Sequence, residues 1–139
     1  MRIHLGGSSR QSLVAARAKL DAAVKGATAA SASELSSQLF FAADVLSKNT
    51  SIRRAFADPS RDAASKGALV KDLFAKSLAA PALEILTDVS TLRWSAAGDL
   101  VHVLEQLAIE AEASAANLNN ELDRVEDELF ETSQLVVDN

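Results

Sequence analysis

Cysteine and tyrosine are both absent from this chain of 139 residues, and proline occurs only twice. Without cysteine, the chain has neither a disulfide framework nor a thiolate metal site. Aromatic residues make up only 4% of the sequence, whereas 48% of the residues are hydrophobic, and many of these are alanine. Because alanine has the highest helix propensity and strand-favouring residues are scarce, the composition is typical of an all-α protein.

Long apolar stretches are also missing. No run approaches the roughly 18–20 apolar residues that a membrane-spanning helix needs. The first ten residues, MRIHLGGSSR, lack the apolar stretch of a signal peptide. We therefore expect a cytoplasmic protein with no direct membrane insertion, long enough to bury one hydrophobic core.

The net charge of −5 is unevenly distributed. Residues 48–76 carry seven basic and three acidic side chains, whereas residues 99–139 carry one basic and eleven acidic side chains. A nucleic-acid interface needs a continuous basic stripe, and acidic residues interrupt the basic segment here. We expect a solvated helix face and no nucleic-acid partner. The acidic segment favours an exposed element or a basic partner.

Helix-capping residues and apolar spacing divide most of the chain into helices. Ser8 or Ser9 is expected to cap the first helix, and Gly26 is placed to end it. Ser31 and Glu34 match the capping box that would start the second helix. The expected helices lie at about residues 9–25, 31–48, 50–58, 62–78 and 81–94 and from residue 98 onward.

The later boundaries rest on proline, aspartate and glycine. The third helix must end near Asp58, because Pro59 disfavours helical geometry at the preceding residue. Asp62 can cap the fourth helix, and Pro81 suits the first turn of the fifth. After Gly98 the sequence contains no further glycine or proline, and apolar residues spaced by three and four predict a long sixth helix.

The sequence thus predicts an all-α bundle of six helices with a long C-terminal helix. Small and polar residues between Ser114 and Asn120 mark the one place where the sixth helix could break in two. We expect three regions: residues 1–8 as a flexible leader, residues 9–116 as the bundle, and residues 117–139 as a helical extension.

Residues that could support catalysis or bind a metal ion do not converge in the sequence. His4 and His102 lie far apart, and neither belongs to a metal-binding motif. Phosphate-binding and dinucleotide-binding glycine motifs are absent, as is a nucleophile elbow. We expect no enzymatic activity, no cofactor and no metal.

Docking of a partner helix in a groove between two helices is the function class that remains. Two helices carry a face of small or moderately apolar side chains, which would let a partner backbone approach closely. These residues are Val14, Ala15, Ala18 and Ala22 on the first helix and Leu83, Thr87, Ser90 and Trp94 on the fifth. Trp94 fits a core position equally well. We expect arginine at Ala18 or Ser90 to block docking without unfolding the domain.

A family resemblance is carried by two stretches, LFFAADVLSKNTSIRRAFADPSRDAASKGALVKDLF and LEILTDVSTLRWSAAGDLVHVLEQL. Together they resemble the N-terminal domain of ATP synthase subunit delta, whose mitochondrial counterpart is the oligomycin-sensitivity-conferring protein. The resemblance covers residues 9–116 and rests on the order of several features: the Asp58-Pro59 turn, Lys66 in the following helix, and Arg93 at the end of the fifth helix.

The resemblance implies a non-catalytic connector in the peripheral stalk of F-type ATP synthase, on the cytoplasmic face of the cell membrane. The groove between the first and fifth helices would receive the N-terminal helix of an α subunit. A b-type stalk subunit would bind through regions absent here. The first helix lacks the family's aromatic–alanine pair, so its contacts are not carried over. The alternative is an unrelated small helical adaptor or regulatory domain.

The end of the sequence resembles an earlier part of it. VEDELFETSQLVVDN parallels SSQLFFAADVLSKN in its apolar pattern. SRQSLVAARAKLDA and RVEDELF are similar to the longer actinobacterial form of delta, which also occurs fused to a b-type stalk segment. We therefore expect residues 117–139 to begin a second repeat of a larger subunit, the rest of which would cover their apolar face.

Overall fold

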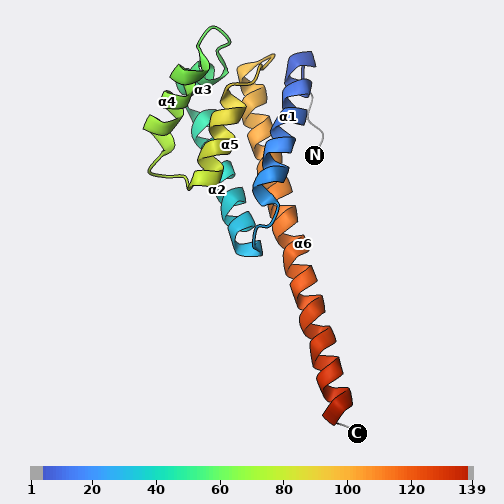
Figure 1. Cartoon of the computed structure of the whole chain (residues 1–139). Helices are drawn as coiled ribbons and strands as arrows, with labels where there is room; N and C mark the ends of the chain where they lie inside the picture. Colours follow the sequence, from blue (N-terminus) through green and yellow to red (C-terminus); the bar gives the residue numbers. More distant parts are fainter. Residues whose placement is uncertain (1–4, 138–139) are drawn as a thin grey trace.

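The computed structural model describes residues 5–137, and the side chains of residues 5–120. Within this part the chain is helical and contains no strand (Figure 1). The helices are α1 (Gly7–Val24), α2 (Ala29–Lys48), α3 (Thr50–Ala57), α4 (Ala63–Phe74), α5 (Ala80–Ser90) and α6 (Ala97–Val137). The predicted all-α fold, with six helices and a long C-terminal helix, is confirmed.

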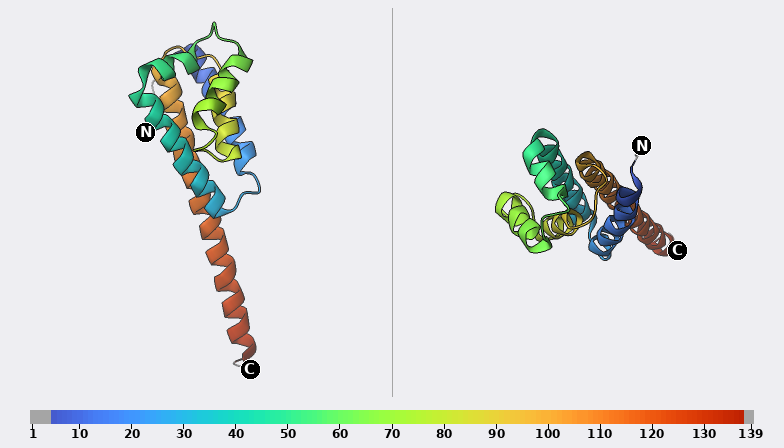
Figure 2. Two further views of the ribbon diagram at one scale, coloured as in Figure 1. Left: turned by 90° about the vertical axis from the view of Figure 1, so that its left-hand side faces the viewer. Right: turned by 90° about the horizontal axis from the view of Figure 1, so that it is seen from above.

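The longest helices, α2 and α6, form the backbone of the bundle. They run side by side in opposite directions and share the largest interface in the molecule. α1, α3 and α5 pack against this pair, and α4 packs against α5 and α3. α6 continues well past the other helices, so its second half projects from the bundle (Figure 2).

The core contains apolar residues from all six helices. Leu39 and Leu46 of α2 and Leu104 of α6 are completely buried, and Phe56 and Phe74 meet edge-on with ring centroids 6.1 Å apart. Each fully buried side chain of this size stabilises the fold by about 1.5–3 kcal/mol. The apolar spacing along α2, α5 and the part of α6 whose side chains are described therefore points at the core.

The start of α1 differs from the prediction. The N-cap is Gly6, because the two serines expected to cap the helix bond instead to Ser95 of the α5–α6 connection and Asp99 of α6. Ser9 donates to Asp99 and accepts from the Ser95 N–H, both at 2.7 Å, and Ser8 lies 3.0 Å from the Ser95 hydroxyl. A Cβ atom at Gly6 would come within 2.5 Å of Ser95, so this close approach requires glycine.

The capping box of α2 lies three residues before the predicted one. Thr28 is the N-cap: its hydroxyl accepts from the Ser31 N–H, and the Ser31 hydroxyl accepts from the Thr28 N–H, both at 3.1 Å. Glu34 accepts instead from the Gln38 side chain. Gly26 has φ +77°, which confirms it as the residue that ends the preceding helix.

Predictions for the end of α3 and for the starts of α4 and α5 are confirmed, but α4 ends at Phe74 and α5 at Ser90, before the predicted residues 78 and 94. α3 ends just before Asp58, Asp62 accepts from the Ser65 N–H at 2.7 Å as the N-cap of α4, and Pro81 lies in the first turn of α5. The break considered between Ser114 and Asn120 does not occur, because nothing in that segment prevents helix continuation.

The three expected regions remain predictions for the residues that the structure does not describe. α1 begins at Gly7, inside the segment expected to be a leader, and residues 1–4, including His4, lie outside the described part. The apolar face of the expected second repeat also falls on side chains that are not described; its members are Leu129, Phe130, Leu135, Val136 and Val137.

Candidate docking groove

α1 and α5 flank a hollow on the surface of the bundle. It has a volume of about 220 Å³. Small and apolar residues, Ala22 and Ala23 of α1 with Pro81 and Ile85 of α5, line its interior. Charged residues complete the lining: Lys19 of α1 and Glu84 and Asp88 of α5.

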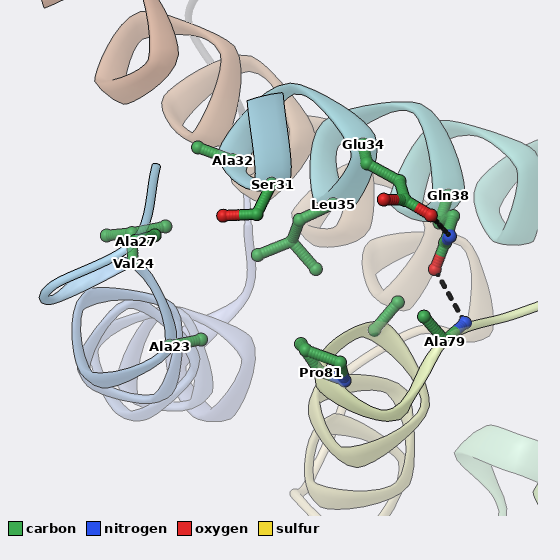
Figure 3. A pocket seen from close by; sticks show the side chains of 11 residues that line it. Ala23, Val24, Ala27, Ser31, Ala32, Glu34, Leu35, Gln38, Ala79 and Pro81 are labelled. Atoms are coloured by element: carbon green, nitrogen blue, oxygen red, sulfur yellow. Dashed lines mark hydrogen bonds between the residues drawn. The ribbon is translucent and has the colours of Figure 1, made fainter. Parts of the chain in front are cut away.

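A second hollow continues from the first. Ala23 and Pro81 line both, and the second hollow reaches between the N-terminal half of α2 and the ends of α1 and α5. Its volume is about 200 Å³, and its lining is mostly apolar. Figure 3 shows Leu35 of α2 pointing into the space between Ala23 and Pro81. We call the two hollows together the α1–α5 groove.

Gln38 closes the α2 side of the groove. Its side-chain oxygen accepts from the Ala79 N–H at 2.8 Å, and its side-chain nitrogen donates to Glu34 at 3.0 Å (Figure 3). The first bond ties α2 to the N-cap residue of α5, whose N–H would otherwise lack a helical partner. This end of the groove is therefore held in a defined shape.

One ion pair links the two helices across the groove. Lys19 Nζ lies 3.8 Å from Asp88 Oδ2, and both side chains are about half exposed. An exposed pair of this kind contributes at most about 1 kcal/mol. The pair can therefore exchange partners when a charged side chain docks beside it.

The groove contains only one of the eight residues predicted for it. Ala22 lines the first hollow. Val14 is 68% exposed and Ala18 is also exposed, while Ala15 is half-buried; none of the three lines either hollow. The small-residue stripe of α1 thus meets the groove only at its C-terminal end.

The predicted stripe of α5 faces α4 rather than α1. Thr87 packs near Gly67 of α4, where an added Cβ atom would lie 3.6 Å from the Thr87 methyl group. Ser90 is completely buried, and its backbone oxygen accepts from Lys66 of α4 at 2.8 Å. Leu83 is half-buried. The structure does not bring the two predicted stripes together, and an arginine at Ser90 would have no space in the folded domain.

Trp94 occupies the core. Its side chain is 9% exposed, and its indole N–H donates to the Val89 oxygen at 3.0 Å. Of the two interpretations that the sequence left open for Trp94, this placement favours the core residue.

Sequence reasoning missed most residues that line the groove. Ile85 follows the same helical spacing as the core residues of α5, so its position in the sequence does not show that it also lines the groove. Lys19 and Asp88 have opposite charges, but only knowledge of which helices are neighbours would pair them. In the part of the chain that the structure describes, no cluster of three potential metal ligands occurs. No helix there has the combined length and apolar character needed to cross a bilayer.

Comparison with known proteins identifies close relatives, although no protein-family model matches the sequence. The chain is 35% identical over 133 residues to a protein of Streptomyces coelicolor named ATP synthase subunit delta, covering 96% of this chain and 48% of the relative. Proteins of the same name from Streptomyces avermitilis and Salinispora arenicola are each 36% identical, and the chain covers 48% and 47% of their lengths. The chain thus spans about half the length of these relatives.

Proposed function

Because this chain is homologous to actinobacterial ATP synthase delta subunits, we propose that it is a non-catalytic connector in the peripheral stalk of an F-type ATP synthase. In this role it holds the catalytic head at the cytoplasmic face of the membrane, so that the head does not turn with the rotor. The homology is the observation that carries this proposal.

The contact with the head is the N-terminal helix of an α subunit, docked in the α1–α5 groove. Small side chains such as Ala22 and Ala23 support this, because they let a partner helix approach the backbone of α1. The apolar hollow below Leu35 offers space for a larger apolar side chain of that helix. An amphipathic helix inserted between two helices is a common mode of recognition.

Charge at the rim of the groove restricts the partner further. Glu84 and Asp88 outnumber Lys19 there. We therefore expect a basic residue beside the apolar face of the docked helix, placed to pair with Glu84 or to compete with Lys19 for Asp88. A contact that must resist torque depends on slow dissociation, which apolar burial provides better than exposed ion pairs.

Calorimetric titration with a synthetic peptide of the cognate α-subunit N-terminal helix, combined with backbone NMR shifts, tests this function. Saturable one-to-one binding with shifts along α1 and α5 is expected. Ala22→Arg should reduce the affinity at least about tenfold, which corresponds to about 1.4 kcal/mol, because the side chain fills the hollow.

Ala113→Arg is the matched control, since Ala113 is an exposed residue of α6 outside the groove. It should leave the affinity unchanged. Ala18→Arg then shows whether the outer surface of α1 also takes part. Equal affinity of the Ala22→Arg variant and the unaltered chain would rule out the groove. Absence of binding by the folded chain would rule out α docking by this part of the protein and favour a helical adaptor with another partner.

A further inference from the structure

A third hollow is lined by residues of segments that Figure 1 shows at the end of the bundle opposite the projecting half of α6. It has a volume of about 100 Å³ and lies between the α3–α4 turn, α4 and the α5–α6 connection. All of its ionisable lining residues are basic: Arg61 from the turn, Lys66 from α4 and Arg93 from the connection. We call it the cationic pocket.

Lys66 is the unusual member of this pocket. It is only 3% exposed, and its ammonium group donates one hydrogen bond, to the Ser90 backbone oxygen at 2.8 Å. An ammonium group has three N–H donors, and burying its charge is costly unless an anion compensates it. Burial lowers the pKa of Lys66, and the negative charge of Asp58 only partly opposes this effect.

No close counter-ion is present among the described side chains of residues 5–120. The ion pairs found there involve other residues, so no carboxylate lies within 4 Å of Arg61, Lys66 or Arg93. The two nearby acids are occupied by local structure. Asp58 accepts from the N–H and hydroxyl of Ser60, and Asp62 caps α4. The positive charge of the pocket is therefore only weakly compensated.

We propose that the cationic pocket binds an oxyanion, meaning a carboxylate or a phosphate group, between Lys66, Arg61 and Arg93. Guanidinium groups donate in a planar fork that matches two oxygens of such an anion, while the ammonium group acts as a compact point charge. The size of the pocket suits a single group of this kind, since pockets for drug-sized ligands measure about 300–1,000 Å³. The site is separate from the α1–α5 groove and does not depend on the proposed function.

Titration of the full chain at constant ionic strength tests the pocket. Sodium phosphate and sodium acetate are added in parallel, against sodium chloride, while NMR follows the backbone and arginine side-chain N–H signals. Saturable shifts at Arg61, Lys66 and Arg93 are expected. Saturation by phosphate but not acetate identifies a phosphate group as the ligand, and saturation by acetate shows that the pocket accepts a carboxylate. Shifts no larger than those in chloride would overturn the proposal.

Substitutions separate a specific site from general attraction by positive charge. Arg61→Gln and Arg93→Gln change exposed side chains, so the fold should persist while the apparent affinity falls about tenfold. Lys71→Gln removes the same charge from an exposed position on α4 and should have no effect. An equal loss of apparent affinity in all three variants would show nonspecific attraction of the anion and overturn the proposed site. Lys66→Met should abolish saturable anion binding. If this variant unfolds, the two arginine variants decide between a specific site and nonspecific attraction.

Discussion

The ammonium group of Lys66 and the backbone oxygen of Ser90 lie 2.8 Å apart, joining α4 to the last turn of α5 inside the protein. This bond and the packing of Thr87 near Gly67 set one side of α5 against α4. The opposite edge of α5, with Pro81, is left to form the α1–α5 groove.

The aliphatic part of Lys66 should matter more for stability than its charge. Lys66→Ala removes buried packing and the bond to Ser90, so we expect a loss of about 2 kcal/mol in the free energy of unfolding. Lys66→Met keeps most of the packing and removes a buried charge, so the loss should be smaller. Urea denaturation measures both, with Lys71→Ala as an exposed control expected to change stability by less than about 0.5 kcal/mol. Equal losses for the methionine and alanine variants would contradict this prediction.

Acid should weaken the α3–α4 turn. Hydrogen bonds from Ser60 lower the pKa of Asp58, and those from Ser65 lower the pKa of Asp62, both from 3.8. Since the folded-state pKa values lie below the unfolded ones, their stabilisation is present above the unfolded pKa and is lost as pH falls through the folded pKa.

Thermal unfolding between about pH 6 and pH 2 measures this effect. The melting temperature should fall with acid, and the double variant Asp58→Asn/Asp62→Asn should show a shallower fall. Parallel curves for the variant and the unaltered chain would show that these two carboxylates do not contribute.

Gly26 should be the glycine at which alanine costs stability through backbone conformation alone. Its φ is +77°, and no atom lies within 4 Å of the position that a Cβ atom would take. Gly26→Ala should therefore destabilise the protein by about 1–2 kcal/mol. Gly98→Ala is the matched control, because Gly98 lies in the first turn of α6, also has open space, and lacks a positive φ. There alanine should be neutral or stabilising by up to about 1 kcal/mol in chemical denaturation. Similar changes in stability at Gly26 and Gly98 would show that the positive φ of Gly26 is not what makes alanine costly there.

The α2–α6 interface should dominate the stability of the bundle. Leu104 is completely buried, and Leu104→Ala should cost about 2–5 kcal/mol through lost packing and a cavity. Ile109 on the same helix is 41% exposed, so Ile109→Ala should cost much less. Guanidinium titrations followed by circular dichroism compare the two. A loss at Ile109 as large as that at Leu104 would indicate that α6 packs in another rotation.

Local signals predicted the helices well because each depends on a few neighbouring residues. Asp62, Gly26 and Pro81 act within one turn of their own positions, and the structure places each as expected. The serines were less informative. A serine hydroxyl can cap a helix or bond to a distant segment, and Ser9 bonds to Asp99 and Ser95, which the local sequence does not indicate.

The groove was harder to predict than the helices that form it. Periodicity indicates which residues share a helix face, but not which neighbour covers that face. Leu83, Thr87 and Ser90 do share a side of α5, yet the bond between Lys66 and Ser90, 24 positions apart, belongs to the α4 contact. The apolar hollow around Leu35 needs three helices in place before it exists.

The length of α6 has a mechanical consequence. Its 41 residues correspond to about 60 Å, whereas the 20 residues of α2 span about 30 Å. α6 therefore behaves as a cantilever clamped along its first half. A sideways load on its far end reaches the bundle as a bending moment on the clamp. There the Ser36 hydroxyl donates to the Ala108 oxygen at 2.6 Å, a point that resists sliding of one helix along the other.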